Sequence, residues 1–240
     1  MSRYINKQEW RLSEQYPVVS FCELAERLKN NMPRPFALQI GAMDGKRFDL
    51  LYAHLISGDW NGLLVEPVPE MFELLQKNYA GCSGLILENC AVADYEGVLG
   101  LSCIDPGVVE KGLVTENLLG VTTARQDNLQ IGSDAFHNRY PFILKEYVRH
   151  IEVPCYTLPR LLTKHNVTKI DLVMTDTEGM DWIILRQLDL KTYEPSIICL
   201  EYTQLGAAGV PECVGHFLNH GYQMAICRED PENLIFHKNL

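Results

Sequence analysis

Short apolar runs alternate along this chain with segments of helical periodicity. The runs Phe36–Ile40, Gly62–Glu66 and Ile170–Met174 are typical of buried strands, and a segment with a helical pattern follows each of them. This alternation indicates β-α-β units, in which helices cover both faces of a mostly parallel sheet. We therefore predict an α/β fold with a seven-stranded main sheet. The other predicted strands are Leu85–Asn89, Ser196–Glu201, Tyr222–Cys227 and Asn233–His237.

The two ends of the chain add to this plan. Tyr222–Cys227 and Asn233–His237 are joined by a short acidic turn, which predicts an antiparallel hairpin at one edge of the sheet. Residues 1–35 contain a helical pattern around Phe21–Asn30 and predict an N-terminal helical cap. A chain of 240 residues can bury one large core, so we expect a single domain over residues 1–240.

Residues 105–150 interrupt the alternation. The segment is polar, rich in glycine and shows little periodicity before Phe136. A stretch of this length between strands usually serves a function, so we predict an insertion that acts as a lid over a binding site. Its aromatic and basic side chains indicate an acceptor that is partly planar or anionic, and we predict that His137, Arg139 and Tyr140 bind it.

The charge balance limits the class of partner. Lys and Arg number 21 against 31 Asp and Glu, which gives a formal net charge of −10, and no basic stripe is interleaved with aromatic residues. Such a chain repels a phosphate backbone, so we expect a small-molecule partner and no nucleic acid. The apolar runs are too short to span a bilayer, and the N-terminus lacks the pattern of a signal peptide. We expect a cytoplasmic protein that does not bind membranes; the sequence is also compatible with a homodimer.

A glycine-bearing loop, Gly41–Gly45, follows the first central strand. Glycine lets a backbone approach a ligand closely, and the start of the next helix offers unpaired N–H groups. Glu66 ends the next strand, where a ribose-binding acid belongs in a nucleotide-binding β-α-β unit. A dinucleotide fingerprint would need glycine at Met43 and Lys46, so the phosphate-binding part is missing. This combination favours S-adenosylmethionine, which has an adenosine but no phosphate, although a plain tight turn is the alternative.

A longer segment carries a more specific pattern. In Ile170–Leu185, a strand leads through Asp176, Thr177, Glu178 and Gly179 into a helix. Four further segments accompany it in order along the chain: Ile40–Gly45, Val65–Pro67, Asn89–Val92, and Pro195–Ile198 followed by Glu201. Together these segments resemble the FkbM-type methyltransferase family over about residues 36–202.

The resemblance implies a Rossmann-like class I methyltransferase that uses S-adenosylmethionine, usually to methylate a hydroxyl oxygen on a small natural product or sugar. It also implies roles for residues at the strand ends. The residues that would contact the methionine part are Gly41, Ala42, Met43, Asp44 and Gly45; Glu66 and Pro67 would lie at the ribose, and Asn89, Cys90 and Ala91 at the adenine. Asp176 would lie beside the sulfonium and the acceptor. Pro159 stands where the family commonly has an aspartate, so any role of that acid is in doubt here.

Methyl transfer to a hydroxyl benefits from a base that accepts the proton. Asp176 is our first candidate, Glu178 the second and His150 the third, and we place Glu201 at the acceptor. The same carboxylates would also suit a divalent ion, and the sequence does not separate a base from a ligand. Thr175 and Glu178 have the spacing of a capping box, a structural interpretation that is compatible with catalysis.

Other interpretations remain open at this point. A carboxyl O-methyltransferase and a non-catalytic binding or scaffold protein are alternatives on the same fold. A nucleotide-dependent oxidoreductase is disfavoured by the missing glycines. Cys213, His216 and His220 have a spacing compatible with a metal site on one helix face, but that face must also pack on the sheet, so we predict no metal site.

Overall fold

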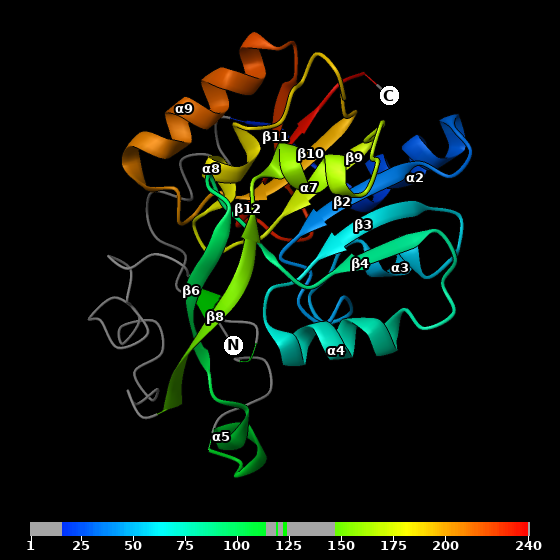
Figure 1. The fold of residues 1–240 in the computed structure, drawn as a ribbon. Coiled ribbons are helices and arrows are strands. Elements are labelled where there is room, and N and C mark those ends of the chain that lie inside the picture. The colour runs from blue at the N-terminus through cyan, green and yellow to red at the C-terminus, as the bar shows by residue number, and fades with distance from the viewer. Residues whose placement is uncertain (1–15, 114–118, 120–121, 124–146, 240) are drawn as a thin grey trace.

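The computed structural model describes residues 16–113, 119, 122–123 and 147–239. Its main sheet has eight strands (Figure 1). In spatial order they are β1 (Val18–Val19), β11 (Gln223–Cys227), β12 (Asn233–His237), β10 (Ile197–Glu201), β9 (Leu172–Thr175), β2 (Phe36–Ile40), β3 (Asn61–Val65) and β4 (Leu85–Glu88). In the described chain, β12 is the strand that runs antiparallel to its neighbours in this sheet.

Helices cover both faces of the sheet, as predicted. On one face, α2 (Phe21–Asn31), α3 (Tyr52–Leu55) and α4 (Pro69–Asn78) share a buried apolar cluster with the strands. On the other face, α7 (Leu158–Lys164), α8 (Asp181–Leu185) and α9 (Gly206–Asn219) do the same. The central strands are apolar on both sides because each side is covered by a helical layer.

The prediction of seven strands is wrong by one, because β1 pairs in parallel with β11 and takes the edge of the sheet. The closing hairpin forms as an antiparallel pair of β11 and β12, but β1 lies outside β11, so the hairpin is one strand away from the edge. The hairpin turn also holds the start of α2, since Glu229 accepts a hydrogen bond from the Phe21 amide at 2.9 Å and another from the Ser20 hydroxyl.

A second, four-stranded sheet projects from the first (Figure 1). Its strands, in spatial order, are β5 (Ala91–Val92), β8 (Val148–Tyr156), β6 (Gly97–Ile104) and β7 (Thr122–Thr123). The ribbon of β6 and β8 pairs in register from Gly97 opposite Cys155 to Ile104 opposite Val148, and α5 (Pro106–Glu110) lies at its tip. Because β8 begins at Val148, the last residues of the predicted insertion belong to this strand.

None of the helices in the described ranges combines the length and hydrophobicity that a membrane-crossing helix requires. Most predicted strand positions, and the helix predicted around Phe21–Asn30, agree with the structure to within a few residues. α3 has only four residues, and α9 contains Pro211.

Candidate active site

The strand order reverses between β2 and β9. From β2 the chain builds outward through β3 and β4, whereas from β9 it builds the other way through β10. In open α/β sheets ligands bind at such a switch point, at the carboxyl ends of the strands. Here those two ends carry Gly41 and Asp176, so the structure brings together two of the predicted site residues.

Gly41 and Asp176 are in close backbone contact. The Asp176 amide donates to the Ile40 carbonyl at 3.1 Å, and a Cβ on Gly41 would lie 1.9 Å from the Asp176 carbonyl oxygen. Gly41 also has φ of +83°, a conformation that residues with a Cβ rarely adopt. Glycine is therefore required at residue 41 for the two loops to meet.

The amides of the 41–47 loop are used inside the protein. Those of Gly41 and Ala42 donate to the Val65 carbonyl at 2.9 and 3.0 Å, and that of Gly45 donates to the Ala42 carbonyl at 2.7 Å. The Met43 amide donates to Glu66 Oε2 at 2.7 Å. These N–H groups cannot also form a phosphate cradle, which argues against a dinucleotide and agrees with the missing glycine fingerprint.

Asp44 shapes this loop from inside. Its Oδ1 accepts from the Lys46 and Arg47 amides at 3.0 and 2.8 Å, and its Oδ2 pairs with Arg47 Nε at 2.6 Å. Burial acts to raise the pKa of Asp44, but the hydrogen bonds and charge of Arg47 outweigh it and the pKa is lowered. The structure thus places Asp44 as an ionised carboxylate that holds the loop.

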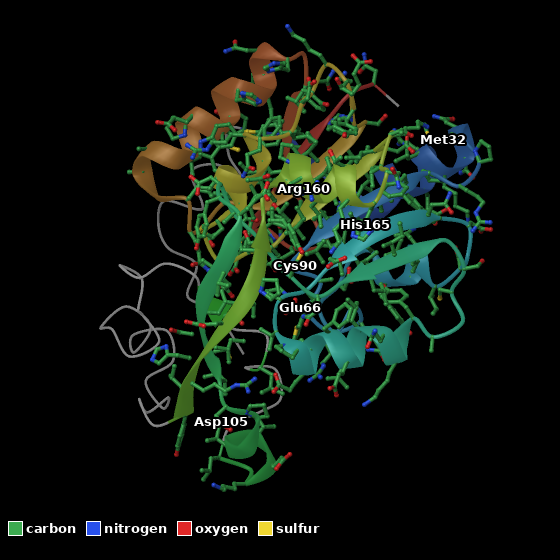
Figure 2. The ribbon with its side chains drawn as sticks, viewed as in Figure 1. Met32, Glu66, Cys90, Asp105, Arg160 and His165 are labelled. Carbon is green, nitrogen blue, oxygen red and sulfur yellow. The ribbon has the colours of Figure 1, made fainter. Side chains whose placement is uncertain are left out.

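Glu66 lies buried directly after β3, with 5% of its surface exposed. Figure 2 shows it between α4 and Cys90. Its Oε2 accepts from Met43 and its Oε1 accepts from the Val68 amide at 2.8 Å. Burial raises its pKa to about 7, although both amides lower it. Each carboxylate oxygen can accept a second hydrogen bond, so Glu66 fits a ligand with two adjacent hydroxyl donors, such as a ribose.

The residues predicted to lie at the adenine follow β4, and the first of them, Asn89, contacts Glu66. Asn89 Nδ2 donates to the carbonyls of Glu66 and Pro67 at 2.7 and 3.1 Å, which joins the ends of β3 and β4. Cys90 and Ala91 are buried and apolar, and burial raises the pKa of the Cys90 thiol to about 12. Cys90 packs in the apolar cluster of the main sheet and Ala91 in that of the second sheet, so their place at the adenine stays a prediction.

Asp176 begins the acidic loop after β9 (residues 176–180), and part of the residue is exposed. Desolvation of the carboxyl, and next the charges of Glu201 and Glu178, raise its pKa well above its usual value. Glu178 follows with φ of +53°, an unusual backbone for a residue with a Cβ. Gln204 Nε2 donates to carboxylates of both Glu178 and Glu201, the second at 3.4 Å.

The capping-box interpretation is wrong. β9 extends through Thr175, which pairs with Ile40 and Leu200, and α8 begins only at Asp181 without a side-chain cap. Instead, Thr177 donates its hydroxyl to Asp181 Oδ2 at 2.9 Å and its amide to the same oxygen at 3.3 Å. Asp181 is fully buried, and this burial raises its pKa. The buried Asp181 carboxylate therefore holds the acidic loop in place at Thr177.

The remaining predicted residues are less central in the described structure. His150 is exposed on β8, where its Nδ1 lies 2.9 Å from the Ser102 hydroxyl, and no described hydrogen bond joins it to the acidic loop. Glu201 is buried at the end of β10 and accepts from the Thr203 hydroxyl. His137, Arg139 and Tyr140 lie outside the described residues.

On α9, His216 and His220 make packing contacts and a hydrogen bond within the protein. The His216 ring packs against Trp182 and Phe217 with centroids 5.2 and 5.3 Å apart, and His220 Nδ1 lies 2.8 Å from the His216 carbonyl oxygen. Among the residues that the structure describes, no group of three or more His, Cys, Asp or Glu side chains could hold a metal ion.

Comparison with known families decides the class of protein. The model of the methyltransferase FkbM domain matches residues 39–224, which is more than half of the chain. The chain belongs to the FkbM methyltransferase family. The match includes the Gly41 loop, Glu66, the acidic loop at Asp176 and the end of β10. Membership of the FkbM family implies a methyl donor, which in methyltransferases is usually S-adenosylmethionine.

One solved structure with a TM-score above 0.5 supports the fold of this FkbM family member. The crystal structure of methyltransferase FkbM from Methylobacillus flagellatus KT has a TM-score of 0.53 at 11% identity and covers 94% of this chain. The match takes up 49% of that protein, so this chain spans about half its length. Precorrin-6y C5,15-methyltransferase from Geobacter metallireducens GS-15 has a TM-score of 0.45 at 9% identity, over 95% of this chain and 96% of that one. The METTL16 MTase domain has a TM-score of 0.45 at 11% identity, over 90% of this chain and 65% of that one. A comparison with curated protein sequences found no match.

These findings establish a Rossmann-like class I methyltransferase fold, as predicted. Three site residues were not predicted from the sequence: Thr177, Asp181 and Gln204. Thr177 and Asp181 lie inside the acidic segment, where an acid four residues after a threonine could have indicated the link. Gln204 offered no signal, because its partner Glu178 is 26 residues away.

Proposed function

We propose that this FkbM methyltransferase transfers the methyl group of S-adenosylmethionine to a hydroxyl oxygen of a small acceptor such as a natural product or sugar. The observation that carries the proposal is Asp176: a partly exposed acid with a raised pKa, located where the loop after β9 meets the loop after β2. A carboxylate of this kind suits a general base that works near neutral pH.

The donor side rests on Glu66 and its surroundings. The two acceptor positions left on the Glu66 carboxylate suit the two ribose hydroxyls. The adenine would lie near Asn89, where β4 ends next to Glu66. The engaged amides of the 41–47 loop offer nothing to a pyrophosphate, which favours S-adenosylmethionine over a dinucleotide. When bound, S-adenosylmethionine supplies an electrophilic methyl group on a sulfonium.

Asp176 would then act on the acceptor. Its carboxylate accepts the hydroxyl proton as the oxygen attacks, a contribution of roughly 10²–10⁴-fold in rate. The backbone of Asp176 is fixed against Gly41, so donor and base share one rigid frame and the reacting atoms can be aligned. The charges of Glu201 and Glu178 keep Asp176 basic.

A carboxyl acceptor fits this environment less well. A carboxylate needs no base to become a nucleophile, and the charges of Glu178, Glu201 and Asp181, which raise the pKa of Asp176, would repel it. A scaffold protein would have no need for a partly exposed acid with a raised pKa at the switch point. Hydroxyl methylation is therefore the function that we favour.

The test is methyl transfer from tritiated S-adenosylmethionine to a panel of sugars, glycosides and phenolic or aliphatic alcohols, with matched carboxylic acids as a second panel. We expect label in at least one hydroxyl compound and none in its carboxylate counterpart. Base-labile label in the carboxylic acids would instead support a carboxyl methyltransferase. Labelling of neither panel, with no binding of S-adenosylmethionine, would favour the scaffold alternative.

A further inference from the structure

The amide of Gln204 joins two acids that come from different strands. Glu178 belongs to the loop after β9, whereas Glu201 is the last residue of β10. Gln204 Nε2 donates to the Oε2 atoms of both, and a side-chain amide has two hydrogens with which to do so. A single half-buried side chain therefore connects the acidic loop to its neighbouring strand.

The backbone around Gln204 does not need this side chain. The turn that leads from β10 to α9 is held by its own hydrogen bonds, from the Leu205 amide to the Tyr202 carbonyl and from the Tyr202 amide to the Glu232 carbonyl, both 3.1 Å long. The hydroxyl of Thr203 already serves Glu201 Oε1. What the Gln204 side chain adds is the contact with Glu178.

The backbone at Glu178 has an unusual conformation. Glu178 has φ of +53° and is followed by Gly179 with φ of +101°, so the loop turns in a conformation that residues with a Cβ rarely adopt. Glu178 lies two residues after Asp176, and its charge acts on that residue. The direction of the Glu178 carboxylate therefore influences the proposed base.

We propose that Gln204 is a positioning residue that holds the Glu178 carboxylate beside Asp176. This inference rests on the proposed function, because the benefit of the arrangement is a correctly oriented charge next to the base. Replacement of Gln204 by alanine removes the link, while Gln204→Glu keeps its size, removes both donors and adds a third carboxylate. Gln204→Glu should lower turnover more than Gln204→Ala, because the new carboxylate would repel the Glu178 carboxylate and turn it away from Asp176.

The decisive experiment observes the Gln204 side-chain amide by ¹⁵N NMR in the complete chain with S-adenosylhomocysteine added, assigned by triple-resonance spectra. We expect proton shifts typical of hydrogen bonds to carboxylates, which move strongly upfield in Glu178→Ala. The control Glu152→Ala, an exposed acid on β8, should leave them in place. A Gln204 amide that is insensitive to Glu178→Ala would overturn the proposal.

A kinetic measurement adds to this test. With a hydroxyl acceptor from the panel, we expect Gln204→Ala to lower kcat about tenfold with KM for S-adenosylmethionine unchanged, and Gln204→Glu to lower kcat further. Gln223→Ala, at an exposed glutamine on β11, is the matched control. An unchanged kcat in a folded Gln204→Ala protein would also overturn the proposal. Calorimetry that detects no binding of S-adenosylhomocysteine to the unmodified protein would instead contradict the proposed function. The NMR test of the hydrogen bond between Gln204 and Glu178 does not depend on that result.

Discussion

Gly41 and Asp176 are in such close contact that the Cβ of any other residue at position 41 would lie 1.9 Å from the Asp176 carbonyl oxygen. This contact connects the loop after β2, which we assign to the methyl donor, with the loop after β9, which we assign to the base. The relative position of these two loops is therefore set by backbone packing at the switch point.

Replacing Gly41 by alanine tests this contact. The added methyl group must displace the Asp176 carbonyl and also adopt φ near +83°, so we expect a loss of about 3–5 kcal/mol in the free energy of unfolding. Gly221→Ala is the matched control, since Gly221 has φ of +82° but an added Cβ would meet no atom within 4 Å, and it should cost only about 1–2 kcal/mol. Urea unfolding measures both. Equal losses of unfolding free energy in the two variants would mean that the contact between Gly41 and Asp176 does not contribute to stability.

Donor binding should depend on pH through Glu66. With a pKa of about 7, this carboxyl is mostly protonated at pH 6 and mostly ionised at pH 8. Ribose hydroxyls donate to the ionised form, so binding should favour deprotonation, and the affinity for S-adenosylhomocysteine should rise roughly tenfold from pH 6 to pH 8. Calorimetry in buffers of different ionisation enthalpy should show proton release at pH 7. Glu66→Gln should bind weakly and without this dependence; proton uptake by the unmodified protein would disagree with the assignment.

If Asp176 is the base, Asp176→Asn should lose more turnover than substitutions of neighbouring acids. Asp176→Asn keeps the size of the side chain but cannot accept the proton, so turnover with a hydroxyl acceptor should fall roughly 10²–10⁴-fold. Glu178→Gln should lose less, because Glu178 acts through its charge. The exposed acid Asp189 provides the control, and Asp189→Asn should have normal activity. Full activity in Asp176→Asn would remove Asp176 from the mechanism.

The hydrogen bond between Thr177 and Asp181 can be tested by measuring the free energy of unfolding, without an activity assay. Thr177→Ala removes a 2.9 Å hydrogen bond to the buried Asp181 carboxylate and should cost about 1–3 kcal/mol in the free energy of unfolding. Thr192→Ala removes a similar bond, 2.6 Å long, to the exposed Asp189, where water can take over, and should cost less than about 0.5 kcal/mol. Denaturant unfolding measures both losses. A larger loss for Thr192→Ala than for Thr177→Ala would contradict the role given to Asp181.

The main-sheet strands were predictable because their hydrophobic runs are bounded by clear breaks. Phe36–Ile40, for example, lies between Pro35 and Gly41, and β2 has these bounds. Glu66 was predictable as well, since its position at the end of the second strand follows from the β-α-β plan. These features depend on local sequence and on regular topology.

Other features depend on pairing between distant segments. β1 has only two residues, too few for a pattern, and forms because Val18 and Val19 pair with residues of β11. The capping box at Thr175 failed because hydrogen bonding within the sheet extended β9 through that residue. Gln204 meets Glu178 only once β9 and β10 lie side by side, so its role emerges from tertiary structure.

Calorimetry at pH 8 tests the donor site, with S-adenosylhomocysteine as the ligand, NADH as the comparison ligand, and Glu66→Gln beside the unmodified protein. We expect the unmodified protein to bind S-adenosylhomocysteine, Glu66→Gln to bind it at least tenfold more weakly, and neither protein to bind NADH. Binding that is equal in the two proteins would contradict the donor site described here, and binding of NADH alone would contradict the assignment of S-adenosylmethionine as the donor.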